Sequence, residues 1–509
     1  MGRDRAGRPS GDVSRADGAG GAAGRAVGHA ILFAVAVYAC TGEASAHAGS
    51  LGGSVAEATV PTWLVVLTGG IVVGGTFLFT TLLTDHEAMR GVNWWRLPVP
   101  IPAAPGRAVR LVLGAASVGL LALVIVTGFT APADPTRDFA VLFVWAGWWA
   151  GFTATTYLVG NTWPLVNPWR ALVALGNRVH GAFGETGGER TTHEGAGGER
   201  TAGGEGRERA SGSIPDSWGV WPAVAGLLAL VWVEVVSPVG EDPRLLAGLV
   251  VAYTLATVAG GLRYGSAWFE RVDPVSRVFA AYGRVAPLQR TGDGVAVRLP
   301  GTALTGDPLP ERPGEIAFVV ALLWVTTYDG LVATPAWKRA VAPLVDAGVP
   351  ALLVYAGALL AGFGLFVGVY RLAARRVRTA ADSYVTARAV ERWFAPALLP
   401  IAAGYHLAHF LGYFVGLAPA LAAVGASPFA PPMNTLVFVL PGWFGTVKLL
   451  CVLGGHVLAI WVAHSLAFEL FPGVLSAIRS QYPSVAVMVF YTMTSLWVIT
   501  QPYGSPPFV

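Results

Sequence analysis

Residues 394–418 read FAPALLPIAAGYHLAHFLGYFVGLA, a stretch without a single Asp, Glu, Lys or Arg. A helix of this length, at about 1.5 Å per residue, crosses the roughly 30 Å hydrocarbon layer of a bilayer. The apolar residues are continuous and do not alternate with polar ones. This pattern favours a membrane helix over a strand of a membrane β-barrel.

Similar apolar segments recur along the whole chain of 509 residues. We therefore predict an all-α, polytopic transmembrane helical bundle with about ten spans after an N-terminal signal peptide. The other nine segments are 62–83, 108–131, 138–160, 218–238, 245–262, 315–334, 349–371, 441–469 and 483–502.

The composition supports a membrane protein. Hydrophobic residues make up 54% of the chain and charged residues 13%, against roughly 25% charged in soluble domains. Mean hydropathy is +0.57. The pI of about 9.1 does not indicate a nucleic-acid partner, because the arginines lie in the gaps between apolar runs. Two cysteines, Cys40 and Cys451, cannot form a disulfide framework or a CxxC metal site.

The N-terminus is predicted to be a disordered region plus a signal peptide, residues 1–46. Arg25 precedes the short apolar run HAILFAVAVYAC, and the small residues Ala44 and Ala46 follow it. This order is typical of a cleaved signal, which would leave His47 at the mature N-terminus. An uncleaved first helix, or lipid attachment at Cys40, is the alternative.

Arginine counts predict the orientation. If the segment at 62–83 runs from outside to inside, the inner loops hold 24 Arg residues and the outer loops hold four Arg or Lys residues. Positive loops stay on the cytoplasmic side. We therefore expect a multi-pass protein of the cell membrane, with the mature N- and C-termini outside.

The chain divides into further parts by composition. The stretch GNTWPLVNPWRAL (160–172) predicts a turn at the membrane surface, or a loop that lines a cavity, because two prolines interrupt any helix there. RYGSAWFERVDPVSRVFAAYGRVAPL predicts an amphipathic interfacial helix, followed by turns or a short hairpin. The parts are 47–180, three spans and this turn; 181–213, a disordered cytoplasmic linker; 214–262, two spans; 263–314, a cytoplasmic interfacial segment; and 315–509, five spans with the histidine cluster.

Polar groups inside the spans are the best guide to function, because burying them in lipid is costly. His406 and His409 are three residues apart and share a helix face. Gly454 and Gly455 precede His456 and permit close helix approach. The full set is Glu234, Asp329, His406, His409, Lys448, His456 and His464.

Topology places several of these groups at similar depth. We predict a site open to the outer side in which His406, His409 and His456, together with His47, bind a divalent metal ion, most often zinc or copper. Asp329 and Glu234 are the candidate catalytic residues, as general base or further ligand. His464 lies roughly 12 Å further along its helix and is a weaker candidate. Alternatively, the histidines only link helices, and Lys448 forms a plain ion pair with Asp329 or Glu234.

Five stretches give the sequence a resemblance to integral membrane proteins of the fenitrothion hydrolase-like family. They are AHAGSLGGSVAEATVPTWL (46–64), GNTWPLVNPWR (160–170), TTYDGLVATPAW (326–337), LLPIAAGYHLAHF (398–410), and GGHVLAIWVAHSLA (454–467) with SQYPSVAVMVFYTMTSLWVIT (480–500). The resemblance implies a multi-helix bundle and hydrolysis of an organophosphate triester. It also places His47, Asp329, His406, His409, His456 and His464 at motif positions. The chain departs in its inserted linker 181–213 and in the AHAG start.

Three functions are compatible with these residues. The first is a metal-dependent ester hydrolase of the membrane, acting on a small molecule of unknown identity. The second is a transporter or assembly factor for a metal or for protons. The third is a b-haem protein, since the absence of CxxCH excludes only c-type haem. Lipid bilayer is the expected surrounding, and no nucleic acid is expected as a partner.

Overall fold

The computed structural model describes residues 61–509 except 103–104, 131, 133, 185–211, 293 and 503. The predicted signal peptide, His47 and most of the 181–213 linker lie outside the described residues. Within them the chain is mainly helical, as predicted, and its few strands are short.

Every apolar segment predicted from the sequence is helical in the described part of the chain. Nine helices there are long and apolar enough to cross a membrane. The tenth, α9 (Trp221–Val236), has 16 residues and would extend only about 24 Å at 1.5 Å per residue. The nine are α2 (Thr62–Thr80), α4 (Arg107–Thr130), the α5–η2–α6 helix (Phe139–Leu158), α10 (Pro243–Tyr264), α13 (Glu315–Val332), α15 (Ala351–Ala380), α17 (Leu399–Ala426, preceded by α16), α18 (Phe444–Leu470) and α19 (Val474–Ile499).

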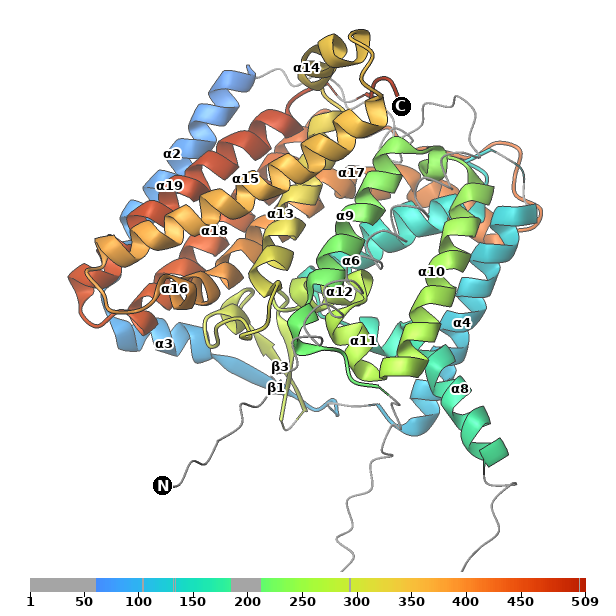
Figure 1. Cartoon of the computed structure of the whole chain (residues 1–509), viewed down its shortest axis with the longest axis horizontal. Helices are drawn as coiled ribbons and strands as arrows, with labels where there is room; N and C mark the ends of the chain where they lie inside the picture. The colour runs from blue at the N-terminus through green and yellow to red at the C-terminus, as the bar shows by residue number, and fades with distance from the viewer. Residues whose placement is uncertain are drawn as a thin grey trace, which may run out of the picture. The chain divides into compact units, whose positions relative to one another are not determined.

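Helix α13 is the centre of the bundle. Of its residues 89% are buried, whereas only 11–22% of the residues in the apolar stretches of α2, α4 and α15 are buried, and these helices turn apolar side chains outward. Figure 1 shows α13 between α15 and α9, with α2 and α4 toward opposite sides. Burial all round the helix explains why its sequence has no polar stripe. Lipid contact explains the exposed apolar residues of the outer helices.

The arginine-rich connections gather at one end of the bundle, which we call the arginine-rich end (Figure 1). They include α3 (His86–Trp94), α8 (Pro168–Gly184), α11 (Ser266–Arg271), α12 (Pro274–Gly283) and α16 (Ala387–Phe394). A three-stranded antiparallel sheet, order β1-β3-β2, joins two of these connections. Its strands are β1 (Arg96–Val99), β2 (Leu288–Thr291) and β3 (Gly294–Arg298). The hairpin β2–β3 lies a few residues earlier than the sequence suggests, and β1 is an addition that the sequence does not indicate.

The opposite, arginine-poor end carries α14 (Pro335–Asp346) and the C-terminal residues (Figure 1). Gly504 N–H donates to Ala333 O, and the Tyr355 hydroxyl donates to Pro507 O. These bonds attach the C-terminal residues to the helices at that end.

Helix α12 is buried by protein, whereas its aromatic and basic composition favours a helix at the membrane surface. Phe279 and Tyr282 are fully buried. Ser276 on the same helix accepts hydrogen bonds from Trp163 Nε1 and Asn167 Nδ2, both at 3.2 Å. The 160–172 stretch is mostly helical, as α7 (Trp163–Val166) and the start of α8, so the prediction that its two prolines exclude a helix is wrong: each proline lies in the first turn, where no backbone N–H is needed. The stretch packs against α12, in agreement with a structural role.

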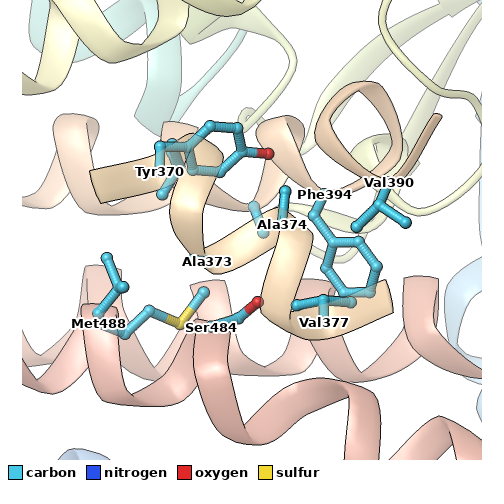
Figure 2. Close-up of a pocket in the computed structure, with 11 residues that line it drawn as sticks. Tyr370, Ala373, Ala374, Val377, Val390, Phe394, Ser484 and Met488 are labelled. Atoms are coloured by element: carbon cyan, nitrogen blue, oxygen red, sulfur yellow. The ribbon is translucent and has the colours of Figure 1, made fainter. Parts of the chain in front are cut away.

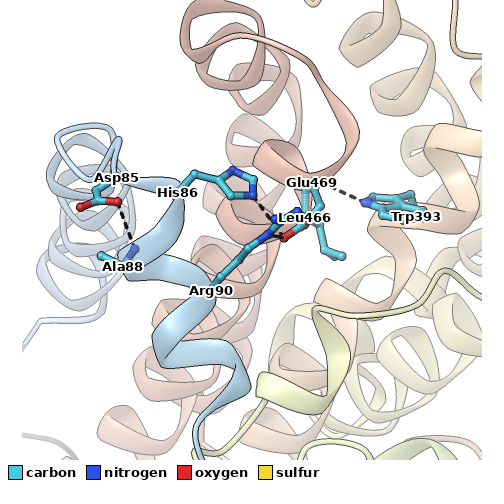
Figure 3. Close-up of polar contacts among 7 residues, drawn as sticks. All are labelled: Asp85, His86, Ala88, Arg90, Trp393, Leu466 and Glu469. Carbon is cyan, nitrogen blue, oxygen red and sulfur yellow. Dashed lines mark hydrogen bonds and ion pairs between the residues drawn. The ribbon is translucent and has the colours of Figure 1, made fainter.

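Helix α3 is held against the end of α18 by ionic contacts (Figure 3). Arg90 donates two hydrogen bonds to Glu469, at 2.8 and 2.7 Å. His86 Nε2 lies 3.4 Å from the same carboxylate. Asp85 accepts from Ala88 N–H and so caps the start of α3. The contact ties the connection after α2 to the last turn of α18.

Candidate functional site

An ion pair between His409 and Asp329 lies in the middle of the bundle. His409 Nε2 on α17 is 2.8 Å from Asp329 Oδ2 on α13, and both side chains are less than 10% exposed. Gly330 lets the two helices approach here. A Cβ on Gly330 would lie 2.8 Å from the Tyr405 hydroxyl and 3.8 Å from His409 Cε1.

The contact with Asp329 indicates which nitrogen of His409 carries the proton. A carboxylate accepts a hydrogen bond, so the proton belongs on Nε2 and the lone pair on Nδ1. This arrangement suits a general base, and it equally suits a metal ligand.

His406 faces a different group of side chains, although it is only three residues from His409. Its Nδ1 lies 3.2 Å from the Tyr157 hydroxyl. The ring is 1% exposed and sits among aromatic rings at centroid distances of 4.6–5.9 Å. These rings are Trp149, Tyr157, Tyr282 and Phe410. Its Nε2 has no hydrogen-bond partner within the described chain.

Trp149 reaches His406 from η2 (Leu142–Phe152), an eleven-residue π-helical stretch. π-Helical turns are wider than α-helical ones and occur often at functional sites. Gly147 and Gly151 let this wide helix pack closely on α17. A Cβ on Gly151 would lie 2.7 Å from Phe414.

His456 lies where α17 and α18 cross. A Cβ on Gly455 would be 2.5 Å from Pro400 O and 3.1 Å from Gly404 Cα, so the two backbones touch here. The expectation that glycine allows this approach is confirmed for Gly455. Gly454 has open space around it. His456 is fully buried, its Nδ1 donates to Val452 O at 2.9 Å, and its Nε2 has no partner among the described residues.

The remaining polar groups of the spans have separate surroundings. His464 Nδ1 is 2.9 Å from Gln481 Oε1, and its Nε2 is 3.0 Å from Leu83 O, so it links α18, α19 and the chain after α2. The carboxyl group of Glu234 on α9 lies close enough to the hydroxyl groups of Tyr328 and Tyr413 to interact with them electrostatically. No ion pair joins Lys448 to Asp329 or Glu234 in the described part of the chain, and the ion pair seen for Asp329 is with His409.

The described residues alone do not make a metal site. Over the described ranges, no group of three or more His, Cys, Asp or Glu side chains is placed to hold a metal ion. His406, His409 and His456 each turn one ring nitrogen to a different partner. His47, the remaining predicted ligand, lies outside the described residues. The predicted His–metal set therefore stays a prediction.

Tyr405 belongs to the site but was not among the residues selected from the sequence. It is 1% exposed, and its ring is nearly parallel to that of His409, with centroids 6.2 Å apart. Its hydroxyl has no hydrogen-bond partner in the described residues. The i, i+4 spacing of Tyr405 and His409 is the sequence signal that could have found it.

A cavity between α15, α16 and α19 is too small and too apolar to be a substrate site (Figure 2). It holds about 20 Å³, room for about one water molecule. Tyr370 lines it, but its hydroxyl donates to Glu391 O. None of the ionisable residues that were selected from the sequence and that the structure describes lines this cavity.

No protein-family model, curated protein or solved structure matches the chain. The resemblance to the fenitrothion hydrolase-like family accordingly stays an expectation from sequence.

Proposed function

We propose that the chain is a hydrolase of the cell membrane that cleaves an ester of a small molecule inside the bilayer, with its arginine-poor end outside. The observation that carries this proposal is the buried ion pair between His409 and Asp329. Ionisable pairs within spanning helices are costly and are commonly retained for function. The resemblance to fenitrothion hydrolase-like proteins supports the same reaction class, an organophosphate triester being one possible substrate.

In this proposal His409 is the general base and Tyr405 is the oxyanion donor. His409 Nδ1 takes a proton from a water molecule while the water oxygen bonds to the ester phosphorus or carbonyl carbon. Asp329 stabilises the imidazolium that forms. The bond to the leaving-group oxygen then breaks, and that oxygen receives the proton from His409. We assign the Tyr405 hydroxyl, which has no hydrogen-bond partner in the described residues, the role of donor to the developing negative oxygen.

This mechanism is written for the His409–Asp329 pair and Tyr405 alone, and it leaves the metal prediction open to measurement. The expected zinc or copper ion would need a ligand such as His47 from outside the described residues. The rate of ester hydrolysis therefore tests the mechanism, and the metal content of the purified protein tests the metal prediction.

A transporter of protons or of a metal is the second candidate. Buried histidines are distributed along the bundle, with His464 toward the arginine-rich end and His456 eight residues earlier on α18, about 12 Å away. His409 lies on the neighbouring helix α17. A series of this kind could relay protons across the layer.

The test uses the full chain in lipid nanodiscs, with p-nitrophenyl butyrate and a dialkyl p-nitrophenyl phosphate as substrates. Wild-type protein should release p-nitrophenol, and His409→Ala should lower the rate by roughly 10²–10⁴-fold, the usual contribution of general base catalysis. His86→Gln, at the ionic contact of α3 with α18, is the matched control and should retain the rate.

Metal content and an optical spectrum of the same samples separate the alternatives. If wild-type protein contains stoichiometric zinc or copper and the His409→Ala variant does not, then His409 is a metal ligand and the proposed site includes the metal. A Soret band would indicate b-type haem instead. If wild-type protein hydrolyses neither ester but carries protons into liposomes, and His456→Ala abolishes that flux, the transporter replaces the hydrolase.

A further inference from the structure

The segment that joins α17 to α18, residues 428–443, is apolar but not helical. It contains no charged residue. Several of its large side chains are exposed, among them Leu436 at 78% and Val439 at 82%. Exposed apolar side chains in a bundle of spanning helices are typical of contact with lipid.

The 428–443 segment runs back along α17 instead of leaving the bundle. Phe438 N–H donates to Gly416 O at 2.8 Å. Leu440 packs on Gly412, where a Cβ would lie 3.0 Å from Leu440 Cδ1 and 3.1 Å from Phe444 Cε1. Gly416 is ten residues before Ala426, the end of α17, or about 15 Å along the helix axis. The segment therefore reaches well into the depth of the bundle before α18 begins.

The contacts of the segment lie on the helix face that carries His409. Gly412 and Gly416 are three and seven residues after His409, so all three lie on one side of α17. Helix α13 ends at Val332, one turn beyond Asp329. Phe438 and Leu440 therefore lie along α17 immediately beyond the His409–Asp329 pair, toward the arginine-poor end.

The backbone of the segment is held by few hydrogen bonds. Within 431–441, Phe438 is the residue whose N–H donates to another backbone group of the described chain. Arg137 Nε donates to Pro432 O at 2.9 Å and so anchors the far part of the segment. Irregular backbone at membrane depth is tolerated only where protein or water satisfies it. The exposed apolar side chains of the segment thus face lipid, while its backbone turns toward α17 and Arg137.

We infer that the 428–443 segment is an access lid over the His409–Asp329 pair, and that the substrate is an uncharged, apolar molecule that enters sideways from the bilayer past Leu440. The outer surface of the lid is apolar and uncharged, so it meets molecules dissolved in lipid. Few backbone bonds must break for it to move. The substrate assignment rests on the proposed hydrolase, whereas the position and movement of the lid do not.

The first experiment measures the surroundings of the lid. Val439→Cys in a Cys40→Ser, Cys451→Ser background is labelled with bimane in nanodiscs. Quenching by brominated phosphatidylcholine, and not by iodide in the buffer, is expected, as for Leu360→Cys on the lipid-exposed side of α15. Lys338→Cys on α14 is the water-exposed control. Quenching of Val439→Cys by iodide alone would overturn the lid's contact with lipid.

The second experiment measures access to the site without relying on hydrolysis. An apolar iodophenyl diazirine that partitions into the bilayer should label Tyr405 and His409 upon illumination. Leu440→Ala removes the side chain against Gly412 and should raise this labelling several-fold. Leu436→Ala, which shortens an exposed side chain of the same segment, should leave it unchanged. Labelling of these residues by a charged, water-soluble diazirine and not by the apolar one would overturn entry from lipid.

The two proposals fail separately. If the diazirine pattern is as expected but wild-type protein hydrolyses no ester, the lid stands and the hydrolase does not. If esters are hydrolysed but Leu440→Ala and Leu436→Ala behave alike in labelling, the hydrolase stands and the lid does not.

Discussion

At the scale of single residues, each buried histidine of the bundle has a different role because it has a different partner. His409 faces a carboxylate, and His406 faces a tyrosine hydroxyl among aromatic rings. His464 lies between a glutamine side chain and a backbone carbonyl. The hydrogen-bond partner of one imidazole nitrogen determines the protonation of the other. Because His409 lies within a spanning helix and contacts a carboxylate, it is the best candidate for proton transfer.

The first prediction concerns Asp329→Asn. The amide keeps the shape of the side chain but loses the charge that stabilises an imidazolium at His409. Ester hydrolysis should fall by about 10³–10⁴-fold, the order seen when the carboxylate behind a catalytic histidine becomes an amide. The rate in nanodiscs measures this, with the exposed Asp307→Asn as control. An unchanged rate would separate Asp329 from the chemistry.

The second prediction concerns Asp138, which caps the start of the α5–η2–α6 helix through Val141 N–H. It is fully buried, and burial raises the pKa of its carboxyl above the ordinary value of 3.8. A raised pKa in the folded state adds stability below the ordinary value, and this stability is lost as pH rises through the raised pKa. The stability of wild type relative to Asp138→Asn should therefore decline as pH rises above the ordinary carboxyl pKa of 3.8. Thermal unfolding in detergent checks this, and parallel pH profiles for the two proteins would contradict it.

At the scale of elements, the crossing of α17 and α18 positions the histidines. The two backbones touch at Gly404 and Gly455, and His456 follows directly. Small residues allow such contacts between spanning helices, where packing rather than the hydrophobic effect drives association. The same principle brings α13 to α17 at Gly330, beside His409.

The third prediction compares Gly455→Ala with Gly454→Ala. A Cβ at 455 meets the Pro400 carbonyl at 2.5 Å, so the helices must separate, whereas a Cβ at 454 meets nothing within 4 Å. Gly455→Ala should lower the free energy of unfolding by about 1–3 kcal/mol, as overpacking usually does. The midpoint of thermal unfolding in detergent measures it. Equal midpoints for the two variants would show that the crossing is not tight.

At the scale of the whole molecule, the four arginine-rich connections lie at one end and α14 at the other (Figure 1). The sheet joins the first of these connections to the third, and Leu309 N–H donates to Arg392 O to join the third to the fourth. The segregation agrees with the alternation of spans that the arginine count predicts.

The fourth prediction concerns orientation. A membrane-impermeant maleimide applied to intact cells should label Ala340→Cys on α14 and should miss Gly292→Cys between β2 and β3. Ala340 is exposed, and Gly292 has open space around it, so a cysteine is tolerated at either position. Labelling of Gly292→Cys and protection of Ala340→Cys would reverse the orientation.

The sequence by itself determined the helical membrane class, the positions of the spans and the segregation of arginines. It could do so because the length of an apolar segment and the charge of its flanking loops decide membrane insertion for each segment separately. It also selected Asp329 and His409, since any ionisable group in a span stands out.

Only the tertiary structure decided which of the selected groups meet. The HxxH spacing predicts one shared site for His406 and His409, but α17 is contacted by α13 on one side and by η2 and α12 on another. His409 therefore meets Asp329, while His406 meets Tyr157. The 428–443 segment carries no helical or charged signal, and its position over His409 follows from the glycines of α17 that it packs against. Contacts of this kind join residues distant in sequence, so their pairing depends on how whole helices pack and cannot be read from local pattern.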